Sequence, residues 1–142
     1  MSLPQPLRGV ITAMITPLTR KGTLDGRGLE RLVEHLISAG VHGLFILGTT
    51  GEGPALPRSL QSDVIKATCQ QVGGRVPVIV GVTETVLEEA VELTAKAKEL
   101  GAQAAVTSAP YYYPASQAEP LTLSRNARGC GETARVPLQR AV

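Results

Sequence analysis

The turn at residues 48–52 is the part of this sequence best suited to hold a small anion. An apolar run over residues 44–47 stops at Gly48, and Thr49, Thr50 and Gly51 follow. Glycines let a backbone turn sharply and approach a ligand closely. Two hydroxyls and free backbone N–H groups at the end of a strand can hold a carboxylate or a phosphate. The same residues also fit a plain strand-to-helix turn whose threonines bond their own backbone, and the neighbouring segments favour the ligand site.

Other potentially reactive side chains are better explained by structure than by catalysis. His35 and His42 have no partner at metal-ligand spacing, so we expect them on the surface or at helix ends. Cys69 and Cys130 form neither a metal motif nor a disulfide framework. Glu52 is placed to bond backbone N–H groups at the start of the next helix. We therefore expect no metal site and no cofactor.

Four apolar segments alternate with helical patterns, which predicts an α/β fold with a parallel sheet. The expected strands are residues 10–15, 44–47, 77–82 and 104–108. The helices between them are expected over residues 26–39, 58–71 and 86–100, with Asp25 and Thr85 as caps and a glycine after each end.

Strand–helix units of about 30 residues with right-handed crossovers fit a (β/α)₈ barrel or a doubly wound sheet. Both folds place their chemistry at the carboxyl ends of the strands, where the turn at residues 48–52 is expected. No Gly-x-Gly-x-x-Gly follows the first strand and no Gly-x-x-x-x-Gly-Lys-Ser is present. The sequence therefore argues against a dinucleotide site or an ATP-binding loop of that type.

The composition and charge of the chain indicate a single domain and argue against nucleic acid and membranes as partners. With 142 residues, 43% hydrophobic and only 3% aromatic, the chain suits one domain with an aliphatic core. A net charge of +2 without a basic stripe argues against nucleic acid as a partner. No apolar run is long enough for a membrane span and no signal peptide is recognisable. We expect a cytoplasmic protein that binds no membrane.

The motifs, in this order, resemble the dihydrodipicolinate synthase / N-acetylneuraminate lyase family of pyruvate-type class I aldolases. The matching segments are residues 9–17, 48–52, 78–82 and 110–112, and the resemblance runs from about residue 7 to residue 117. It implies a partial (β/α)₈ TIM barrel, about the first four β/α units, in an N-terminal half-barrel domain of residues 1–119.

The resemblance also implies a site and a reaction. Members of the family form a Schiff base between a lysine and pyruvate or a related 2-oxo acid, then make or break a carbon–carbon bond. Thr50, with Gly48 and Gly51 beside it, would bind the carboxylate of the 2-oxo acid. Thr49 and Tyr112 would form a proton relay, with Tyr112 reaching into a neighbouring subunit of a homodimer or homotetramer. The two threonines favour a member similar to 4-hydroxy-tetrahydrodipicolinate synthase.

The Schiff-base lysine, which the resemblance places on a sixth strand, is absent. The lysines of the chain lie in a loop or on outward helix faces: Lys21, Lys66, Lys96 and Lys98. A lysine nucleophile needs a buried or cationic setting that lowers its pKa. We therefore expect a lyase by descent that is catalytically incomplete and inactive alone. The alternative is a non-catalytic carboxylate-binding or regulatory half-barrel.

The tail at residues 120–142 does not continue the helical pattern. Residues 124–131 carry two glycines and no apolar stripe. A one-base shift in one permitted set of codons for residues 123–131 encodes a helix of the expected kind. We interpret the tail as the frameshifted end of a truncated barrel. A genuine short paralogue with an irregular tail is the alternative, and the nucleotide sequence decides between the two.

Overall fold

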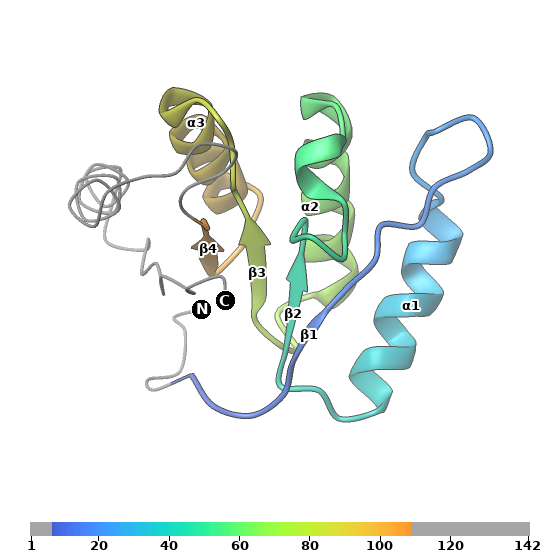
Figure 1. The fold of residues 1–142 in the computed structure, drawn as a ribbon. Helices are drawn as coiled ribbons and strands as arrows, with labels where there is room; N and C mark the ends of the chain where they lie inside the picture. Colours follow the sequence, from blue (N-terminus) through green and yellow to red (C-terminus); the bar gives the residue numbers. More distant parts are fainter. Residues whose placement is uncertain (1–6, 109–142) are drawn as a thin grey trace.

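The computed structural model describes residues 7–108, and the structure below is that of these residues. Strands and helices alternate along the chain (Figure 1). The elements are β1 (Ile11–Ala13), α1 (Gly26–Ser38), β2 (Gly43–Ile46), the 3₁₀ turn η1 (Gly53–Ala55), α2 (Arg58–Val72), β3 (Val78–Gly81), α3 (Leu87–Glu99) and β4 (Ala104–Val106). The predicted alternation of strands and helices is confirmed.

The strands form one parallel sheet in the order β1-β2-β3-β4. Leu44 of β2 pairs with Val78 of β3, and Val80 of β3 pairs with Ala105 of β4. Figure 1 shows the helices packed against one side of this sheet. Because all strands run the same way, their carboxyl ends share one edge of the sheet, and the turn after β2 lies at that edge.

The core fills the space between the sheet and the helices. Alternate residues of the strands face the helices, and the rows of Val, Leu and Ile bury their side chains there. The least exposed members from the strands and helices are Val33, Leu44, Ile46, Ile65, Val78, Val80 and Leu93. Cys69 packs against this cluster as a half-buried small residue, and burial raises the pKa of its thiol to about 11.

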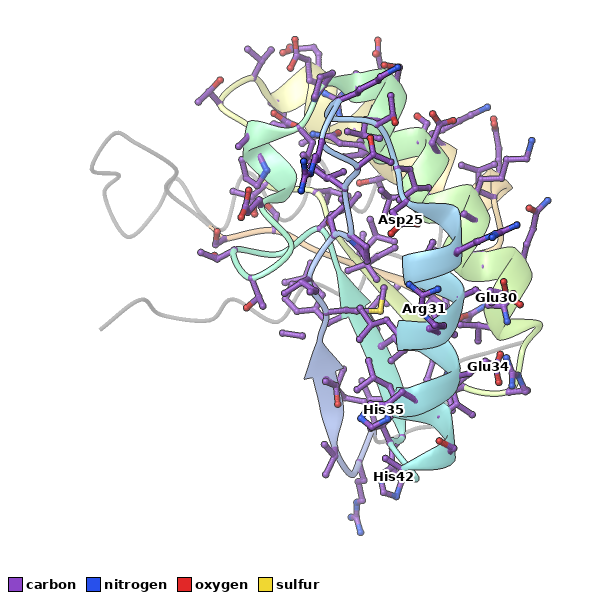
Figure 2. The ribbon with its side chains drawn as sticks, turned by 90° about the vertical axis from the view of Figure 1, so that its right-hand side faces the viewer. Asp25, Glu30, Arg31, Glu34, His35 and His42 are labelled. Atoms are coloured by element: carbon purple, nitrogen blue, oxygen red, sulfur yellow. The ribbon has the colours of Figure 1, made fainter. Side chains whose placement is uncertain are left out.

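The helix caps differ in how well the sequence predicted them. The Asp25 carboxylate accepts a hydrogen bond from the Gly28 N–H at 2.9 Å, so the predicted cap of α1 is confirmed (Figure 2). The predicted cap at Thr85 is wrong. Helix α3 begins at Leu87, and the preceding Val86 is extended and offers no side-chain cap. Val86, which the sequence placed inside this helix, precedes it and is 45% exposed.

The two histidines lie on the surface near the amino ends of the strands (Figure 2). His35 is in the last turn of α1, and the Nδ1 atom of His42 accepts a hydrogen bond from the Val10 N–H at 3.1 Å. Their predicted surface and helix-end positions are confirmed. None of the helices within residues 7–108 has the length and apolar character needed to cross a bilayer.

Candidate active site

The turn after β2 begins at Leu47, one residue before Gly48, where the sequence placed its start. The sequence predicted that the strand includes Leu47, but β2 ends at Ile46 and Leu47 has a φ of 57°. This left-handed conformation is costly for a residue with a side chain. The Leu47 side chain is buried, so packing holds the strained backbone in place. The chain therefore turns at Leu47 and carries Thr49 and Thr50 to the exposed rim of the sheet.

Hydrogen bonds close the turn around one carbonyl. The N–H groups of Gly51 and Gly53 both donate to the Gly48 carbonyl, at 3.0 and 3.2 Å. The Thr16 hydroxyl, after β1, donates to the Gly51 carbonyl at 2.7 Å and so joins the turn to the neighbouring strand. Gly48 and Gly51 are thus structural parts of the turn.

Thr49 and Thr50 are both exposed residues of this turn. Within residues 7–108, neither their backbone N–H groups nor their hydroxyls donate a hydrogen bond to another protein group. Two adjacent N–H groups and two hydroxyls are therefore available on the rim, and such a set of donors suits a carboxylate. The structure brings together four of the predicted site residues, and Tyr112 lies outside the described residues.

Two glycines make room for the Leu47 carbonyl. A Cβ atom on Gly53 or on Gly81 would collide with that carbonyl. Gly81 is the last residue of β3, so the turn packs directly onto the backbone of the next strand. The importance of Gly81 was not predicted, since a strand glycine 30 or so residues away gives no local signal of this contact.

A buried polar network supports the turn from below. The side chain of Gln61 is almost fully buried, and its amide donates to the carbonyls of Gly53 and Leu56 at 2.9 and 3.2 Å. Its oxygen accepts from Arg58 at 3.0 Å, and Arg58 also pairs with Glu84 at 3.2 Å. The sequence reasoning missed this network. The available signal was a polar residue, Gln61, on the apolar side of a helix.

The predicted role of Glu52 is wrong. Its side chain makes no capping hydrogen bond, it is exposed, and its φ is 54°. The turn η1 lies between Glu52 and the start of α2, so the carboxylate is not next to the free N–H groups of that helix.

Hydroxyl groups also lie at the ends of the next two strands. The Thr83 and Ser108 hydroxyls are 3.2 Å apart, and the Ser108 N–H donates to the Thr83 hydroxyl at 3.0 Å. With Thr16, Thr49 and Thr50, they form a rim of hydroxyls along the carboxyl edge of the sheet. Such a rim can donate and accept protons and hydrogen bonds.

The lysines do not lie in the buried environment that would lower the pKa of a lysine nucleophile. All four are exposed: Lys21, Lys66, Lys96 and Lys98. Lys96 pairs with Glu99 at 3.1 Å. In the described part of the chain, no three His, Cys, Asp or Glu residues are grouped so that they could hold a metal ion.

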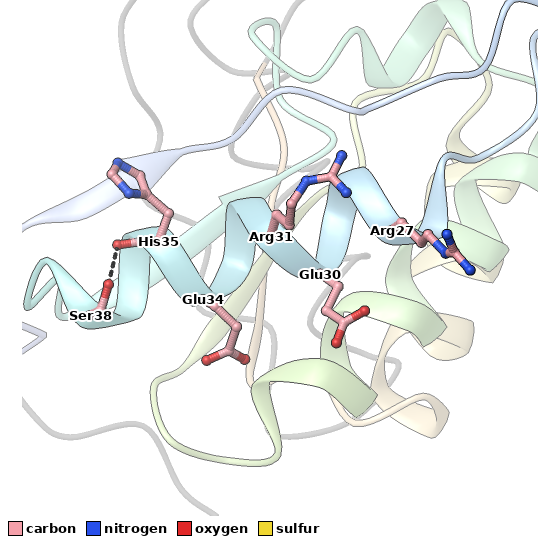
Figure 3. A pocket seen from close by; sticks show the side chains of 6 residues that line it. All are labelled: Arg27, Glu30, Arg31, Glu34, His35 and Ser38. Atoms are coloured by element: carbon pink, nitrogen blue, oxygen red, sulfur yellow. Dashed lines mark hydrogen bonds between the residues drawn. The ribbon is translucent and has the colours of Figure 1, made fainter.

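A hollow of about 600 Å³ lies on the outer face of α1 (Figure 3). Its lining comes from this one helix: Arg27, Glu30, Arg31, Glu34, His35 and Ser38. Its charged groups alternate in sign, and the Ser38 hydroxyl donates to the backbone carbonyl of His35 at 2.9 Å. This hollow is a solvated helix face and shares no residue with the turn at residues 48–52.

Comparison with known proteins places the fold. The chain is 40% identical over 111 residues to the 4-hydroxy-tetrahydrodipicolinate synthase of Protochlamydia amoebophila, covering 78% of this chain and 37% of that protein. The structure of dihydrodipicolinate synthase from Bacteroides thetaiotaomicron matches 97% of this chain and 45% of that chain, with 40% identity and a TM-score of 0.85. A prophage protein of the dihydrodipicolinic acid synthase family from E. coli K12, solved in complex with pyruvate, has 33% identity and a TM-score of 0.88. It matches 94% of this chain and 44% of that chain.

The chain thus spans less than half the length of these relatives. The solved relatives are TIM-barrel proteins, so the predicted partial (β/α)₈ barrel is confirmed. The family model of the dihydrodipicolinate synthetases matches residues 6–123, which includes the whole sheet and the turn after β2. On this match and these structural likenesses, the chain belongs to the dihydrodipicolinate synthetase family.

Proposed function

We propose that the turn at residues 48–51 binds the carboxylate of pyruvate or a related 2-oxo acid, as one half of a Schiff-base lyase or synthase site. The observation that carries the proposal is the set of donors on Thr49 and Thr50, which have no hydrogen-bond partner within residues 7–108 and lie at the exposed edge of the sheet. The pyruvate complex of the E. coli relative supports the choice of ligand. The similarity to 4-hydroxy-tetrahydrodipicolinate synthases favours that branch of the family.

The roles proposed for the site residues come from the resemblance to the family, and the donors on Thr49 and Thr50 support the part that concerns these two residues. The Thr50 hydroxyl and N–H would bind the carboxylate, while Gly48 and Gly51 keep the backbone close to it. Thr49 would pass protons, as a hydroxyl that both donates and accepts, and Tyr112 would complete the relay in a homodimer or homotetramer. The exposed lysines are not suited to form the imine, so its nitrogen would have to come from outside these 142 residues.

Pyruvate titration of the full chain tests the binding step. We expect the amide signals of Thr49 and Thr50 to shift as pyruvate binds. Thr50→Val removes the hydroxyl at nearly constant volume and should weaken binding about tenfold, while Thr50→Ser keeps the hydroxyl and should bind nearly as well. Pyruvate binding that is unaffected by Thr50→Val would reject the proposed site.

Borohydride reduction in the presence of pyruvate tests the chemical step. Reduction of an imine would leave a stable adduct on the lysine that formed it. We expect no adduct on Lys21, Lys66, Lys96 or Lys98, because each is exposed to solvent. An adduct on any of the four, located by peptide mass, would show that this polypeptide contains its own nucleophile.

A further inference from the structure

We infer that Gln61 and Arg58 are positioning residues for the carboxylate-binding turn, an inference that rests on the function proposed above. Gln61 lies at the start of α2 and is 4% exposed. Its amide nitrogen donates to the carbonyls of Gly53 and Leu56, which belong to the segment that follows Thr50. A buried amide that bonds two backbone carbonyls fixes the position of that segment.

Gly53 connects the Gln61 amide to the ligand-binding residues. The Gly53 N–H donates to the Gly48 carbonyl at 3.2 Å, while the Gly53 carbonyl accepts from Gln61 at 2.9 Å. Gly53 also packs so closely on the Leu47 carbonyl that a Cβ atom at this position would collide with it, and a displacement of Gly53 would break one or both of these hydrogen bonds. Gln61 therefore acts on the turn through Gly53 and does not itself touch the proposed ligand.

Arg58 sets the orientation of the Gln61 amide. One guanidinium nitrogen donates to the Gln61 oxygen at 3.0 Å and pairs with Glu84 at 3.2 Å. The Gln61 nitrogen is thereby turned toward the carbonyls of the turn. The other terminal nitrogen pairs with Glu89 in the first turn of α3, at 3.3 Å.

These contacts also join two loops at the carboxyl edge of the sheet. Glu84 follows β3, and its carboxylate lies 3.4 Å from the Gln61 nitrogen. Its side chain is only 14% exposed, so its pair with Arg58 is better shielded from water than the pair with Glu89. The network therefore couples the turn after β2 to the loop after β3, and with it the relative placement of Thr50 and Thr83.

The test compares variants of this network with a matched network far from the site. In the full chain, Gln61→Met removes the amide at similar volume, and Arg58→Met removes the charge. Arg75→Met is the control, because Arg75 makes a similar set of bonds at the other end of α2. We expect pyruvate affinity to fall about tenfold in Gln61→Met and several-fold in Arg58→Met, to recover in Arg58→Lys, and to stay unchanged in Arg75→Met.

Three readouts separate positioning from general stability: the pyruvate dissociation constant, the melting temperature, and amide exchange at Thr49, Thr50 and Gly53 without ligand. Unchanged affinity in Gln61→Met, or an equal loss in Arg75→Met, would overturn the inference. If the parent chain binds no pyruvate, the proposed function fails and the ligand-free readout decides. Faster exchange confined to the turn then supports positioning, and unchanged exchange rejects it. If Gln61→Met does not fold, Arg58→Met and Arg58→Lys decide by the same measurements.

Discussion

At each end of α2, an arginine, a glutamine and a glutamate are joined by hydrogen bonds. One of these groups joins two helices, whereas the other positions the backbone of a turn. At the end far from the site, Arg75 contacts both oxygens of Glu34 at 2.8 and 2.6 Å, and Gln71 donates to Glu34 at 2.6 Å. That network joins two helices at the surface. At the site end, Gln61 is buried and its amide bonds the backbone of a turn. The same chemistry thus supports helix packing at one end and the shape of a candidate ligand site at the other.

The two regions also differ in which residues occupy left-handed backbone positions. After α2, the left-handed position is filled by Gly73, with a φ of 58°. In the turn after β2, the left-handed positions are filled by Leu47 and Glu52, with φ of 57° and 54°. Glycine makes such a conformation inexpensive, whereas residues with side chains store strain. Within residues 7–108, the left-handed residues that carry side chains are therefore confined to the turn that holds the candidate donors.

The strongest way to break this comparison is to close the space around the Leu47 carbonyl. Gly53→Ala and Gly81→Ala would each force a methyl group into that carbonyl. We expect each to lower the free energy of unfolding by on the order of 3 kcal/mol or more, since rigid backbone must move. Gly26→Ala is the control, because nothing lies near its added methyl and it sits in the first turn of α1. Urea denaturation measures all three, and equal stabilities would refute the tight packing.

The far end of α2 can be tested through acid titration. Hydrogen bonds from Arg75 and then Gln71 lower the pKa of Glu34 from its ordinary value of 4.5 to about 2. Because the folded-state pKa is the lower one, this contribution to stability is complete above pH 4.5 and is lost as the pH falls toward 2. Arg75→Met should return the Glu34 pKa toward 4.5 and remove that part of the acid sensitivity.

Carboxyl NMR titration of Glu34 measures this change directly. Arg58→Met is the matched control, since it removes an arginine from the other end of the same helix and should leave the Glu34 pKa as it is. A Glu34 pKa that stays low in Arg75→Met would show that Arg75 is not its main cause, and a Glu34 pKa that changes in Arg58→Met would show that the two networks are not independent.

The middle of α2 offers a smaller effect. The Thr68 hydroxyl is fully buried and, among the described residues, has no hydrogen-bond partner. Thr68→Val replaces it with a methyl group of similar size and should stabilise the fold by about 1 kcal/mol. Thr94→Val makes the same change where the hydroxyl donates to the Ala90 carbonyl at 2.7 Å, so no gain is expected there. Thermal unfolding of both variants would sharpen the contrast between the two ends of α2 and its middle.

The smallest predicted effect concerns strain at an exposed position of the turn. Glu52→Gly relieves a left-handed backbone without removing a side-chain hydrogen bond of the described structure, and should stabilise by no more than about 1 kcal/mol. Gly22→Ala is the reverse change at a φ of 75° with open space around it, and should destabilise by about as much. Stabilisation in both variants would contradict the account of strain.

Local patterns were enough to predict the elements and the position of the turn. The periodicity of apolar residues placed the strands and helices to within about two residues, and Asp25 was a correct cap because capping depends on near neighbours. Thr85 failed as a cap because α3 begins only at Leu87, and the residue directly before it, Val86, is extended. The contacts of Gln61 with Glu84 and of Leu47 with Gly81 join residues far apart in sequence, so no local pattern could predict them.

The close fit of the Leu47 carbonyl against Gly81 has a consequence for anyone who searches for this turn or moves it into another protein. The sequence Gly-Thr-Thr-Gly alone does not specify this turn. The shape of the turn also requires a strand residue without a side chain more than 30 positions later. A pattern that omits this distant glycine will accept sequences unable to form the turn. If residues 47–53 alone are grafted into another protein, the Leu47 carbonyl will collide with the side chain of the neighbouring strand. The turn and the strand that carries Gly81 must therefore be transferred together.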